Sequence, residues 1–412
     1  MNRELAKTVL AAFRTNDAAV MRRSFAPFDE RAWKRTGRWL HSSGMALHFL
    51  DRVTKLGITD AMPASVVHEL SLNLAQNRAR TADLFEEFQR LNTVMLRAGI
   101  SFVNVKGFSL APAAFADPAL RYQQDLDFLV ARRDMERSAE LLERLGYQRR
   151  VWPAETWEFS SGVQEKSSIR ELYRVRPVKN VELHPLPEAE EKEHGCDRIS
   201  RMKLQVGNGF EFPALNDADQ LLSQATHIFK HLQGEWTRTA WLLEYANAVR
   251  SRKDDAAVWR DATAAIETAP EIRTGVAVAG LLTECAFDVS FPREFRDCTI
   301  GRLRPEVRLW VEHYQEDLAL NQHPGSKLYL LLEEVLKGND PQTKAQRRNR
   351  LLPLHLPPKV MHADPRNLRT RWRASAAQLW FTAGRLWFHV SEGLRYKLEA
   401  VRWRRFLSGA RL

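Results

Sequence analysis

Three hydrophobic patterns follow one another along the chain. Over residues 1–100, apolar side chains recur at intervals of three and four, which predicts helices. The clearest stretch runs from Leu70 to Leu96 and stops before Gly99, a residue that suits the end of a helix. We therefore expect residues 1–99 to form an N-terminal helical region.

Between residues 100 and 215 the pattern changes to short runs of β-branched and aromatic residues. Five runs have the composition of strands: residues 102–105, 126–130, 147–152, 169–175 and 180–184. Asp134 can cap a helix from Met135 to Leu145, with Gly146 as its stop. We expect an α/β core over residues 100–215 and an α+β fold for the whole chain.

Helical spacing returns after residue 215 and predicts a helical domain over residues 216–340. Six segments carry it: residues 217–233, 238–252, 256–268, 273–286, 303–320 and 326–337. Pro341 to Pro365 is rich in proline and basic residues, which predicts a linker. Arg366 to Leu412 then predicts one or two basic helices, so that residues 341–412 make a linker and an aromatic amphipathic tail.

The composition is that of a globular protein, but the charge is unevenly placed. The chain has 412 residues, of which 44% are hydrophobic and 27% charged, and this excludes wholesale disorder, collagen-like repeats and disulfide scaffolds. The net charge of +11 favours an anionic partner. Residues 341–412 hold 16 Lys and Arg against 3 Asp and Glu, so they carry +13 while residues 1–340 carry −2.

Three cysteines, Cys196, Cys285 and Cys298, form no C-x-x-C pair and indicate a reducing compartment. The apolar stretch from Thr8 to Phe13 is too short for a signal-peptide core. No apolar run approaches the roughly 18 residues of a membrane-spanning helix. We expect a cytoplasmic protein, either soluble or peripheral at the inner face of the membrane.

The most informative residues lie in the α/β core, where Asp125 and Asp127 alternate with Leu126 and Phe128. Side chains at positions i and i+2 of a strand point to one face, so the two carboxylates can converge on one hard cation. Glu182, set between apolar strand residues, offers a third carboxylate. Three carboxylates on adjacent strands suit metal-dependent phosphoryl or nucleotidyl transfer, although alternating aspartates on a strand are also common where one face meets solvent.

A turn at Lys106-Gly107 follows the first predicted strand. Such a turn can bring backbone N–H groups and a cation close to phosphates. Together with the alternating aspartates, it favours a nucleotide site.

These residues resemble a known family. The run Val105-Lys106-Gly107, the stretch Arg121 to Val130 and the helix ending at Leu145-Gly146-Tyr147 are similar to the uncharacterised nucleotidyltransferase family of the DNA polymerase β-like superfamily. The acidic strand end at Glu182-Leu183-His184 and the histidines before Trp241 extend the resemblance over roughly residues 30–255.

The resemblance implies transfer of a nucleoside monophosphate from an NTP to an acceptor, with Mg²⁺ or Mn²⁺. Asp125 and Asp127 match the metal-binding pair, and Glu182 matches the third acid, as a general base or metal ligand. Lys106 and Gly107 match the turn that faces the triphosphate.

Two further residues are candidates for nucleotide binding. Arg121 is either a contact to the triphosphate, an anchor for the carboxylates or a surface arginine. Ser109 either touches a phosphate or only caps a helix.

His227 and His231 stand one turn apart on a predicted helix. They lack the glutamate of an H-E-x-x-H zinc motif and a third nearby ligand. They either pack inside the helical domain or line the nucleotide cleft.

The tail from Arg366 to Leu412 mixes aromatic side chains with eleven Lys and Arg residues. It suits an anionic membrane surface, RNA, or packing of its aromatics on the helical domain. Nucleic acid is the less favoured of the anionic partners.

Three functions follow from these patterns. The first is an NTP-dependent and Mg²⁺-dependent nucleotidyltransferase that acts on an unidentified hydroxyl acceptor. The second is a non-catalytic module that senses or binds nucleotide. The third is a peripheral membrane protein that acts in envelope polysaccharide assembly.

Overall fold

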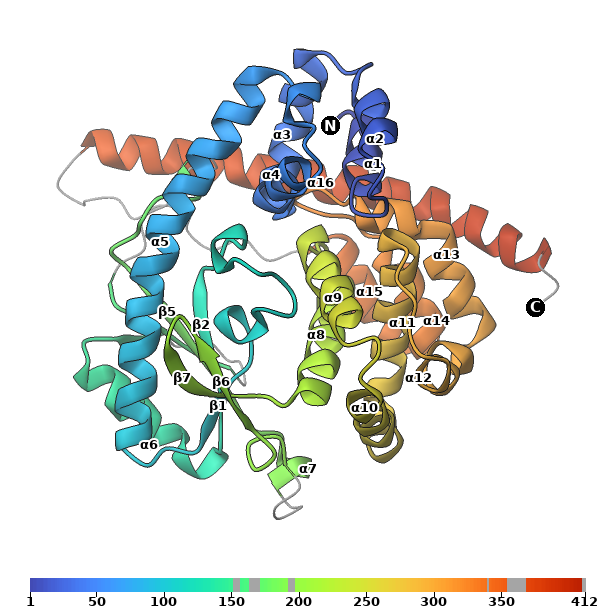
Figure 1. Ribbon diagram of the computed structural model, residues 1–412. Coiled ribbons are helices and arrows are strands. Elements are labelled where there is room, and N and C mark those ends of the chain that lie inside the picture. The colour runs from blue at the N-terminus through green and yellow to red at the C-terminus, as the bar shows by residue number, and fades with distance from the viewer. Residues whose placement is uncertain (151–155, 163–170, 192–196, 339–340, 354–367, 410–412) are drawn as a thin grey trace.

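The computed structural model describes residues 1–150, 156–162, 171–191, 197–338, 341–353 and 368–409. One mixed sheet and many helices make up these residues, which confirms the α+β class (Figure 1). Among the helices of the described residues, none combines the length and the apolar character that crossing a membrane requires.

Five helices precede the first strand: α1 (Arg3–Ala11), α2 (Ala18–Phe25), α3 (Glu30–Ser42), α4 (Met45–Lys55) and α5 (Ala64–Arg97). The first three begin at Asn2, Asp17 and Asp29, whose side chains accept hydrogen bonds from backbone N–H groups of the first turn. Helix α5 ends at Ala98-Gly99, with Gly99 at φ +66°, as its sequence predicts.

The sheet has seven strands: β1 (Phe102–Asn104), β2 (Asp125–Val130), β3 (Gln148–Arg150), β4 (Trp157–Ser160), β5 (Asn180–Pro185), β6 (Lys203–Gly207) and β7 (Phe210–Ala214). Their order is β3-β4-β5-β2-β1-β7-β6. Strand β2 runs parallel to β5 and antiparallel to β1, so β2 lies at the middle of the sheet.

One face of the sheet is covered by α5 and by α6 (Met135–Arg144) (Figure 1). Phe88 of α5 and Leu142 of α6 share a core with Leu126 and Phe128 of β2. Because strand side chains alternate, the aspartates on either side of Leu126 point to the opposite face. Burial of the apolar face therefore fixes where the carboxylates point.

Helix α7 (Glu188–Glu191) lies between β5 and β6 in the chain. After the last strand, the described residues form the helices α8 (Asp217–Leu232), α9 (Thr239–Ser251), α10 (Ala256–Thr268), α11 (Pro270–Phe287), α12 (Arg293–Cys298), α13 (Pro305–Ala319), α14 (Tyr329–Lys337) and α15 (Pro341–Leu351). Helices α8 to α14 share one large core with α1 to α4. The N-terminal helices thus pack on the helical half of the protein, and α5 connects that half to the sheet (Figure 1).

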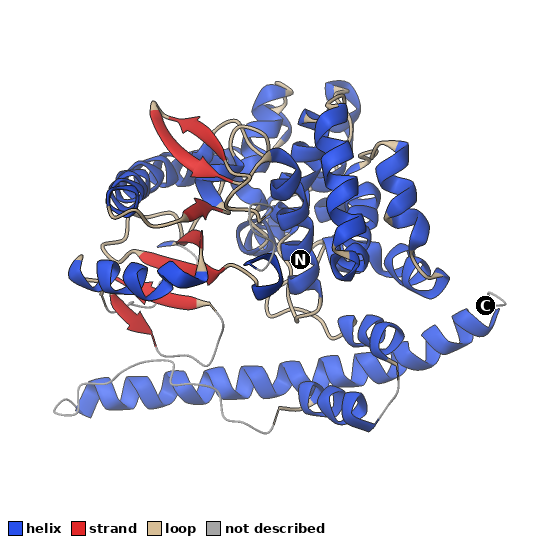
Figure 2. Ribbon diagram, turned by 90° about the horizontal axis from the view of Figure 1, so that it is seen from below, coloured by secondary structure: helices blue, strands red, loops and turns tan. Residues whose placement is uncertain are grey.

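The last helix, α16 (Leu368–Gly409), runs as one rod along one side of the molecule (Figure 2). It packs on the helical half through Ala400 and Trp403, which belong to the large core. Helix α15 occupies part of the predicted linker, since residues 341–351 lack an internal proline and can form a helix. Residues 354–367 lie outside the described residues.

One predicted strand is wrong where it can be checked. Of residues 169–175, the described part forms a turn around residues 171–174. The apolar pattern there reflects burial of Tyr173 against Leu47, Leu120 and Tyr122, and not strand pairing. Strand β3 is confirmed at Gln148–Arg150, whereas Trp152 lies outside the described residues. Strands β4, β6 and β7 were not predicted.

Candidate active site

A row of charged residues crosses the sheet on the face opposite α5 and α6. The register of β2 and β5 pairs Asp127 with Glu182, and that of β5 and β4 pairs Glu182 with Glu158. Arg150 of β3 is paired with Glu158 and extends the row. Since paired residues of neighbouring strands share one face, backbone register alone brings the three carboxylates side by side.

His184 and Lys106 join the carboxylates. His184 Nε2 lies 2.9 Å from Asp127 Oδ1 and 3.4 Å from Glu182 Oε2. Lys106 Nζ donates to Asp127 Oδ1 at 2.5 Å and stands 4.0 Å from Glu182 Oε2. The side chain of Asp127 is 3% exposed, whereas that of Glu182 is 26% exposed. Asp127 is therefore the buried centre of the cluster, and Glu182 is its solvent-facing edge.

The donor set fits a divalent cation. Asp127, Glu182 and His184 each offer one ligand atom, and these atoms lie within 4.8 Å of one another. Two carboxylates and an imidazole suit Mg²⁺, Mn²⁺ and related ions. Asp125 stands two residues before Asp127 on the same face and adds a further carboxylate to this side of the sheet.

The pKa values of the two aspartates are driven apart. Burial and the negative charges of Asp127 and Glu182 raise the pKa of Asp125 to about 7. Burial alone would also raise the pKa of Asp127, but Lys106 and His184 outweigh it and hold that pKa well below its usual range. Burial is the largest cause of the raised pKa of Asp125, and a cation bound beside the carboxylates would lower that pKa.

The turn before the cluster depends on glycine. Gly107 has φ +61°, and a Cβ atom there would lie 2.1 Å from Gln123 Nε2. That amide donates to the carbonyl of Asp125 at 2.9 Å, so it cannot move away without loss. Gly107 therefore allows the turn after β1 to pack directly against the start of β2.

Ser109 lies in the same turn but is buried. Its hydroxyl donates to the carbonyl of Lys106 at 3.1 Å, and its carbonyl accepts from Gln220 of α8 at 2.5 Å. Its contacts thus hold the Lys106 turn against the helical half.

Arg121 also faces the helical half. Its Nε donates to both carboxylate oxygens of Glu244 on α9, at 3.2 and 3.3 Å. Asn77 of α5 donates to the carbonyls of Ala119 and Arg121 and fixes the loop before β2. The structure thus places Arg121 in a buried ion pair on the segment that leads to Asp125.

The histidines at positions 227 and 231 pack against Trp241 in edge-on and tilted contacts. The rings of His227 and His231 lie 4.7 and 4.4 Å from that of Trp241, centroid to centroid. Burial, with Lys106 as the next cause, lowers the pKa of His227 to about 2 and that of His231 to about 4. Both rings are therefore neutral. His227, Trp241 and Lys106 line one small pocket between the sheet and α8 and α9.

Comparison with known proteins identifies the family of this chain. The model of the uncharacterised nucleotidyltransferase family matches residues 29–287. The chain belongs to the uncharacterised nucleotidyltransferase family. The matched residues contain the whole charged row and the Lys106 turn, whereas α12 to α16 lie beyond them.

A solved structure is similar to part of this chain. An antigenic nucleotidyltransferase-like protein from Paracoccidioides brasiliensis shares 10% identity, over 52% of this chain and 93% of its own, with a TM-score of 0.30. None of the curated proteins matches the chain.

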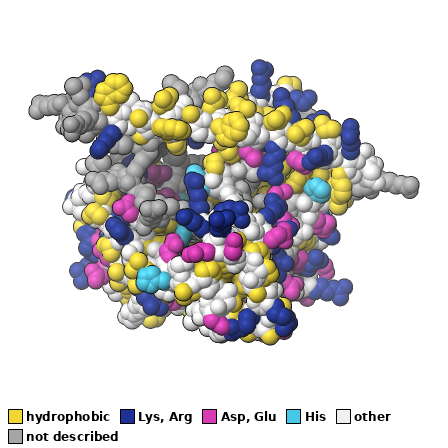
Figure 3. All heavy atoms as spheres, turned by 90° about the horizontal axis from the view of Figure 1, so that it is seen from above, with side chains coloured by type: hydrophobic (Ala, Val, Ile, Leu, Met, Phe, Trp, Pro, Cys, Tyr) yellow, Lys and Arg dark blue, Asp and Glu magenta, His cyan; other side chains and the backbone are white. Residues whose placement is uncertain are grey.

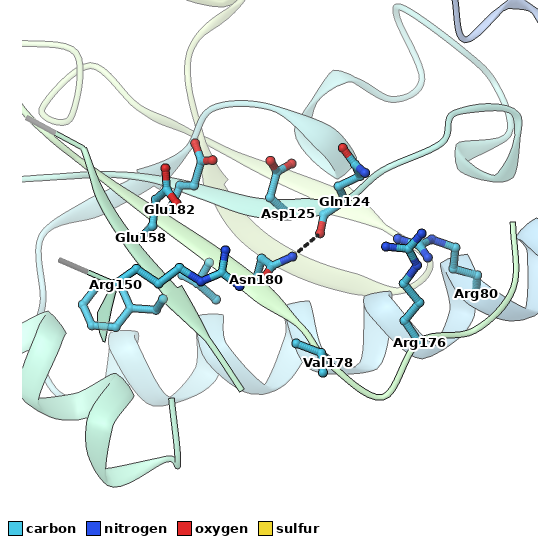
Figure 4. A pocket seen from close by; sticks show the side chains of 11 residues that line it. Arg80, Gln124, Asp125, Arg150, Glu158, Arg176, Val178, Asn180 and Glu182 are labelled. Carbon is cyan, nitrogen blue, oxygen red and sulfur yellow. Dashed lines mark hydrogen bonds between the residues drawn. The ribbon is translucent and has the colours of Figure 1, made fainter. Parts of the chain in front are cut away.

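A pocket of about 170 Å³ opens beside the carboxylates of this nucleotidyltransferase family member (Figure 4). Asp125, Glu158 and Glu182 point into it from the sheet. Arg80 of α5 and Arg176 lie at its other end (Figure 4). The site thus combines an acidic side, where a cation fits, with a basic side, where an anion fits.

His184 and Glu158 are among the site residues that the sequence interpretation missed. His184 directly follows the Glu182-Leu183 pair. Because it stands two residues after Glu182 on a strand, its side chain is expected on the same face as Glu182, and this spacing could have identified it. Glu158 gives no such signal, because it enters the site only through the pairing of β4 with β5.

Proposed function

We propose that this protein is a metal-dependent nucleotidyltransferase, which transfers a nucleoside monophosphate from an NTP to a hydroxyl acceptor. The observation that carries the proposal is the pairing of Asp127 with Glu182 on one sheet face, beside a pocket with acidic and basic sides. Family membership supports the same class of reaction.

In this proposal Asp125, Asp127 and Glu182 hold Mg²⁺ or Mn²⁺, with His184 beside them. The cation would neutralise phosphate charge and lower the pKa of the acceptor hydroxyl. Lys106 lies 2.5 Å from Asp127, so its ammonium group balances that carboxylate when no cation is bound. A cation held by Asp127 would take over that balance, which would leave the Lys106 ammonium group for a phosphate oxygen.

The transfer itself is a displacement at phosphorus. The acceptor oxygen bonds to the α-phosphorus, the bond from that phosphorus to the bridging oxygen breaks, and pyrophosphate leaves. We assign the hydroxyl proton to Glu182, since its side chain reaches solvent whereas that of Asp127 is buried. Glu182 then acts as the general base and Asp127 as the fixed charge of the site.

The remaining predicted residues take binding and positioning roles. In this proposal Lys106 and the backbone at Gly107 contact the triphosphate, as the family resemblance implies. Ser109 and Arg121 hold this turn and the start of β2 against α8 and α9 through Gln220 and Glu244. Their contribution is the geometry of the site.

A second candidate function is nucleotide sensing without turnover. The contact between Lys106 and Asp127 favours it, because a lysine ammonium in that place neutralises Asp127 without any metal. A sensor needs the pocket and the basic side chains, but it does not need Asp127 to be free for a cation.

The decisive experiment compares the wild-type protein with Asp127→Asn and Glu182→Gln. Purified protein is incubated with each α-labelled NTP and Mg²⁺ or Mn²⁺, and both pyrophosphate release and Mn²⁺-dependent binding of a fluorescent nucleotide are measured. We expect both variants to lose pyrophosphate release by roughly 1,000-fold, since each removes charge on which the transition state depends.

Glu211→Gln is the matched control, because Glu211 is an exposed carboxylate on β7 of the same sheet. It should behave as the wild type in both assays. Nucleotide binding without metal dependence and without pyrophosphate release would leave the sensor as the function. Absence of nucleotide binding in the wild type would contradict both candidates.

A further inference from the structure

The largest exposed apolar surface of the described residues lies on α16. Trp372, Trp380 and Trp387 are 76%, 79% and 73% exposed, although tryptophan is ordinarily well covered. Exposed aliphatic side chains lie along the same helix at Leu379, Leu386, Val390, Leu394, Leu398 and Val401. Apolar surface of this kind on a soluble protein marks an interaction site.

These side chains form one stripe. At 100° per residue, the three tryptophans and six aliphatic residues named above fall within one third of the helix circumference, whereas Phe381, which is 39% exposed, lies outside that third. We call the face formed by these nine residues the α16 stripe; it spans 30 residues, or about 44 Å at 1.5 Å per residue. Phe388, Ala400 and Trp403 lie on the other side and are buried. Helix α16 therefore has two apolar faces. One packs on the protein core, and the other is exposed on the surface.

The charge around the α16 stripe is positive. Between residues 371 and 409 there are eight Lys and Arg residues and two acidic residues, Glu392 and Glu399. Both glutamates face the body: Glu392 accepts from the backbone N–H of Lys327, and Glu399 from the hydroxyl of Tyr314. Lys397 and Arg405 continue the stripe at its C-terminal end and are exposed. The stripe thus presents apolar and cationic groups to the outside.

The surface view shows the same arrangement. Along the upper edge of Figure 3, where α16 runs, hydrophobic side chains alternate with Lys and Arg, and the acidic side chains lie closer to the body. Tryptophan and arginine together are typical of helices that lie in the headgroup region of a bilayer. Around Phe388, Ala400 and Trp403 the opposite face packs on the protein, so in this part of α16 the apolar side chains of the stripe are the ones available for contact.

We infer that the α16 stripe docks this protein on an anionic phospholipid surface, with the helix lying in the plane of the interface. A second copy of the chain fits the stripe less well, since antiparallel stripes would bring the basic end near Arg405 against the arginines near Trp372. RNA also fits less well, because Leu379, Leu394 and Val401 offer neither stacking nor hydrogen bonds to bases. Lipid satisfies both the aliphatic groups and the arginines.

Co-sedimentation of the full chain with vesicles tests this inference. The vesicles contain phosphatidylcholine alone or phosphatidylcholine with 30 to 40% phosphatidylglycerol, a proportion of about one third that gives a negative surface potential. We expect the wild type to pellet with the anionic vesicles and to release as salt is raised. Trp380→Ser/Trp387→Ser should weaken partitioning by roughly 100-fold, because two large side chains no longer enter the interface.

The matched control is Leu204→Ser/Val206→Ser, which removes two exposed apolar side chains from β6, away from α16. It should pellet as the wild type does. A circular-dichroism melt of each variant establishes that the protein is folded, and exposed positions on both elements make loss of folding unexpected. Arg404→Gln/Arg405→Gln should weaken binding to anionic vesicles by roughly 10-fold or more and leave neutral vesicles unaffected.

Four outcomes would overturn the inference. In the vesicle assay, these are a wild type that does not pellet with anionic vesicles, or equal pelleting of the wild type and Trp380→Ser/Trp387→Ser. The other two are a dimer of the wild type that the tryptophan substitutions dissociate, and binding of RNA without binding of vesicles. None of them depends on nucleotidyl transfer, so failure of this test and failure of the proposed function are separate results.

Discussion

The sheet face and α16 depart from ordinary globular packing in opposite directions. On the sheet, charged groups are buried: Asp127 is 3% exposed and is surrounded by Lys106, His184 and Glu182. On α16, apolar groups are exposed, and Trp380 is 79% accessible. The first region thus buries charged groups away from water, and the second exposes apolar side chains to water.

The comparison shows how each arrangement is maintained. Asp127 stays charged although it is buried, because Lys106 and His184 pair with it and hold its pKa well below its usual range. The exposed apolar stripe persists because the other side of α16 contributes Ala400 and Trp403 to the core, which fixes the helix whatever covers its outer face. Substitutions in the first region should therefore affect folding strongly, and those on the stripe should not.

Breaking a buried ion pair is expected to have the largest effect on stability. Glu244→Gln leaves Arg121 without its counter-charge at a position where the two side chains are 4% and 12% exposed. We expect a loss of about 3 kcal/mol in the free energy of unfolding, measured by urea denaturation. Arg402→Gln, which removes an exposed partner of Glu399 on α16, should cost less than about 0.5 kcal/mol. Similar losses for the two variants would contradict the distinction between the regions.

Two glycines give the next contrast. Gly107→Ala forces a Cβ against Gln123 at a positive φ and should destabilise the protein by about 2 kcal/mol. Gly384→Ala, in α16 with open space around it, should stabilise the protein by about 0.5 kcal/mol through helix propensity. Thermal unfolding of both variants measures the difference, and a gain in stability for Gly107→Ala would disprove the close packing of the turn.

The pH dependence of stability sharpens the picture of the helical half. Burial, then the charges of Arg121 and Lys55, lower the pKa of His48 to about 4 in the folded protein. Because the unfolded chain binds this proton near pH 6.5, the stability that neutral His48 confers is present above that pH and is lost as pH falls towards 4. Between pH 7 and 5 we expect His48 to account for about 2 kcal/mol of the lost stability.

His48→Gln should remove that part of the pH dependence. Urea denaturation at pH 7, 6 and 5 measures the free energy of unfolding of the wild type and the variant. The quantity compared is the slope of that free energy against pH, and not its value at one pH. Parallel profiles for the wild type and the variant would show that His48 takes up its proton equally in both states.

The smallest effect is expected on the α16 stripe. Trp380→Ser/Trp387→Ser should change the free energy of unfolding by less than about 0.5 kcal/mol, since both side chains are exposed. Trp33→Ser in the core of the N-terminal helices should cost about 3 kcal/mol or more. A loss for the exposed pair close to that of Trp33 would mean that the stripe is covered by this chain itself.

Local pattern predicted much of the fold and part of the site. Alternation around Leu126 and Phe128 predicted a strand with Asp125 and Asp127 on one face, and β2 confirms the strand. The Lys106-Gly107 turn was also visible, because glycine at the end of an apolar run marks a break. These features depend on residues within a few positions of one another, and the sequence displays them directly.

Features that depend on pairing of distant segments were not predicted. Glu158 joins the row only through the register of β4 with β5, and Arg121 meets Glu244 across 123 residues of chain. Tyr173 was read as part of a strand because burial in a turn and burial in a strand give similar apolar patterns. The roles assigned to Asp125, Asp127 and Glu182 stay predictions until the transfer assays are made.

The sequence by itself determined the α+β class, the alternating aspartates and a C-terminal segment, residues 341–412, that carries +13 of charge. Only the tertiary structure decided which carboxylates meet and which side of α16 faces outward. The physical reason is that side-chain alternation and helical spacing fix the faces of each element, whereas the choice of face for the core depends on the shapes and apolar surfaces of all elements together. For α16 that choice left Trp380 and Trp387 outside.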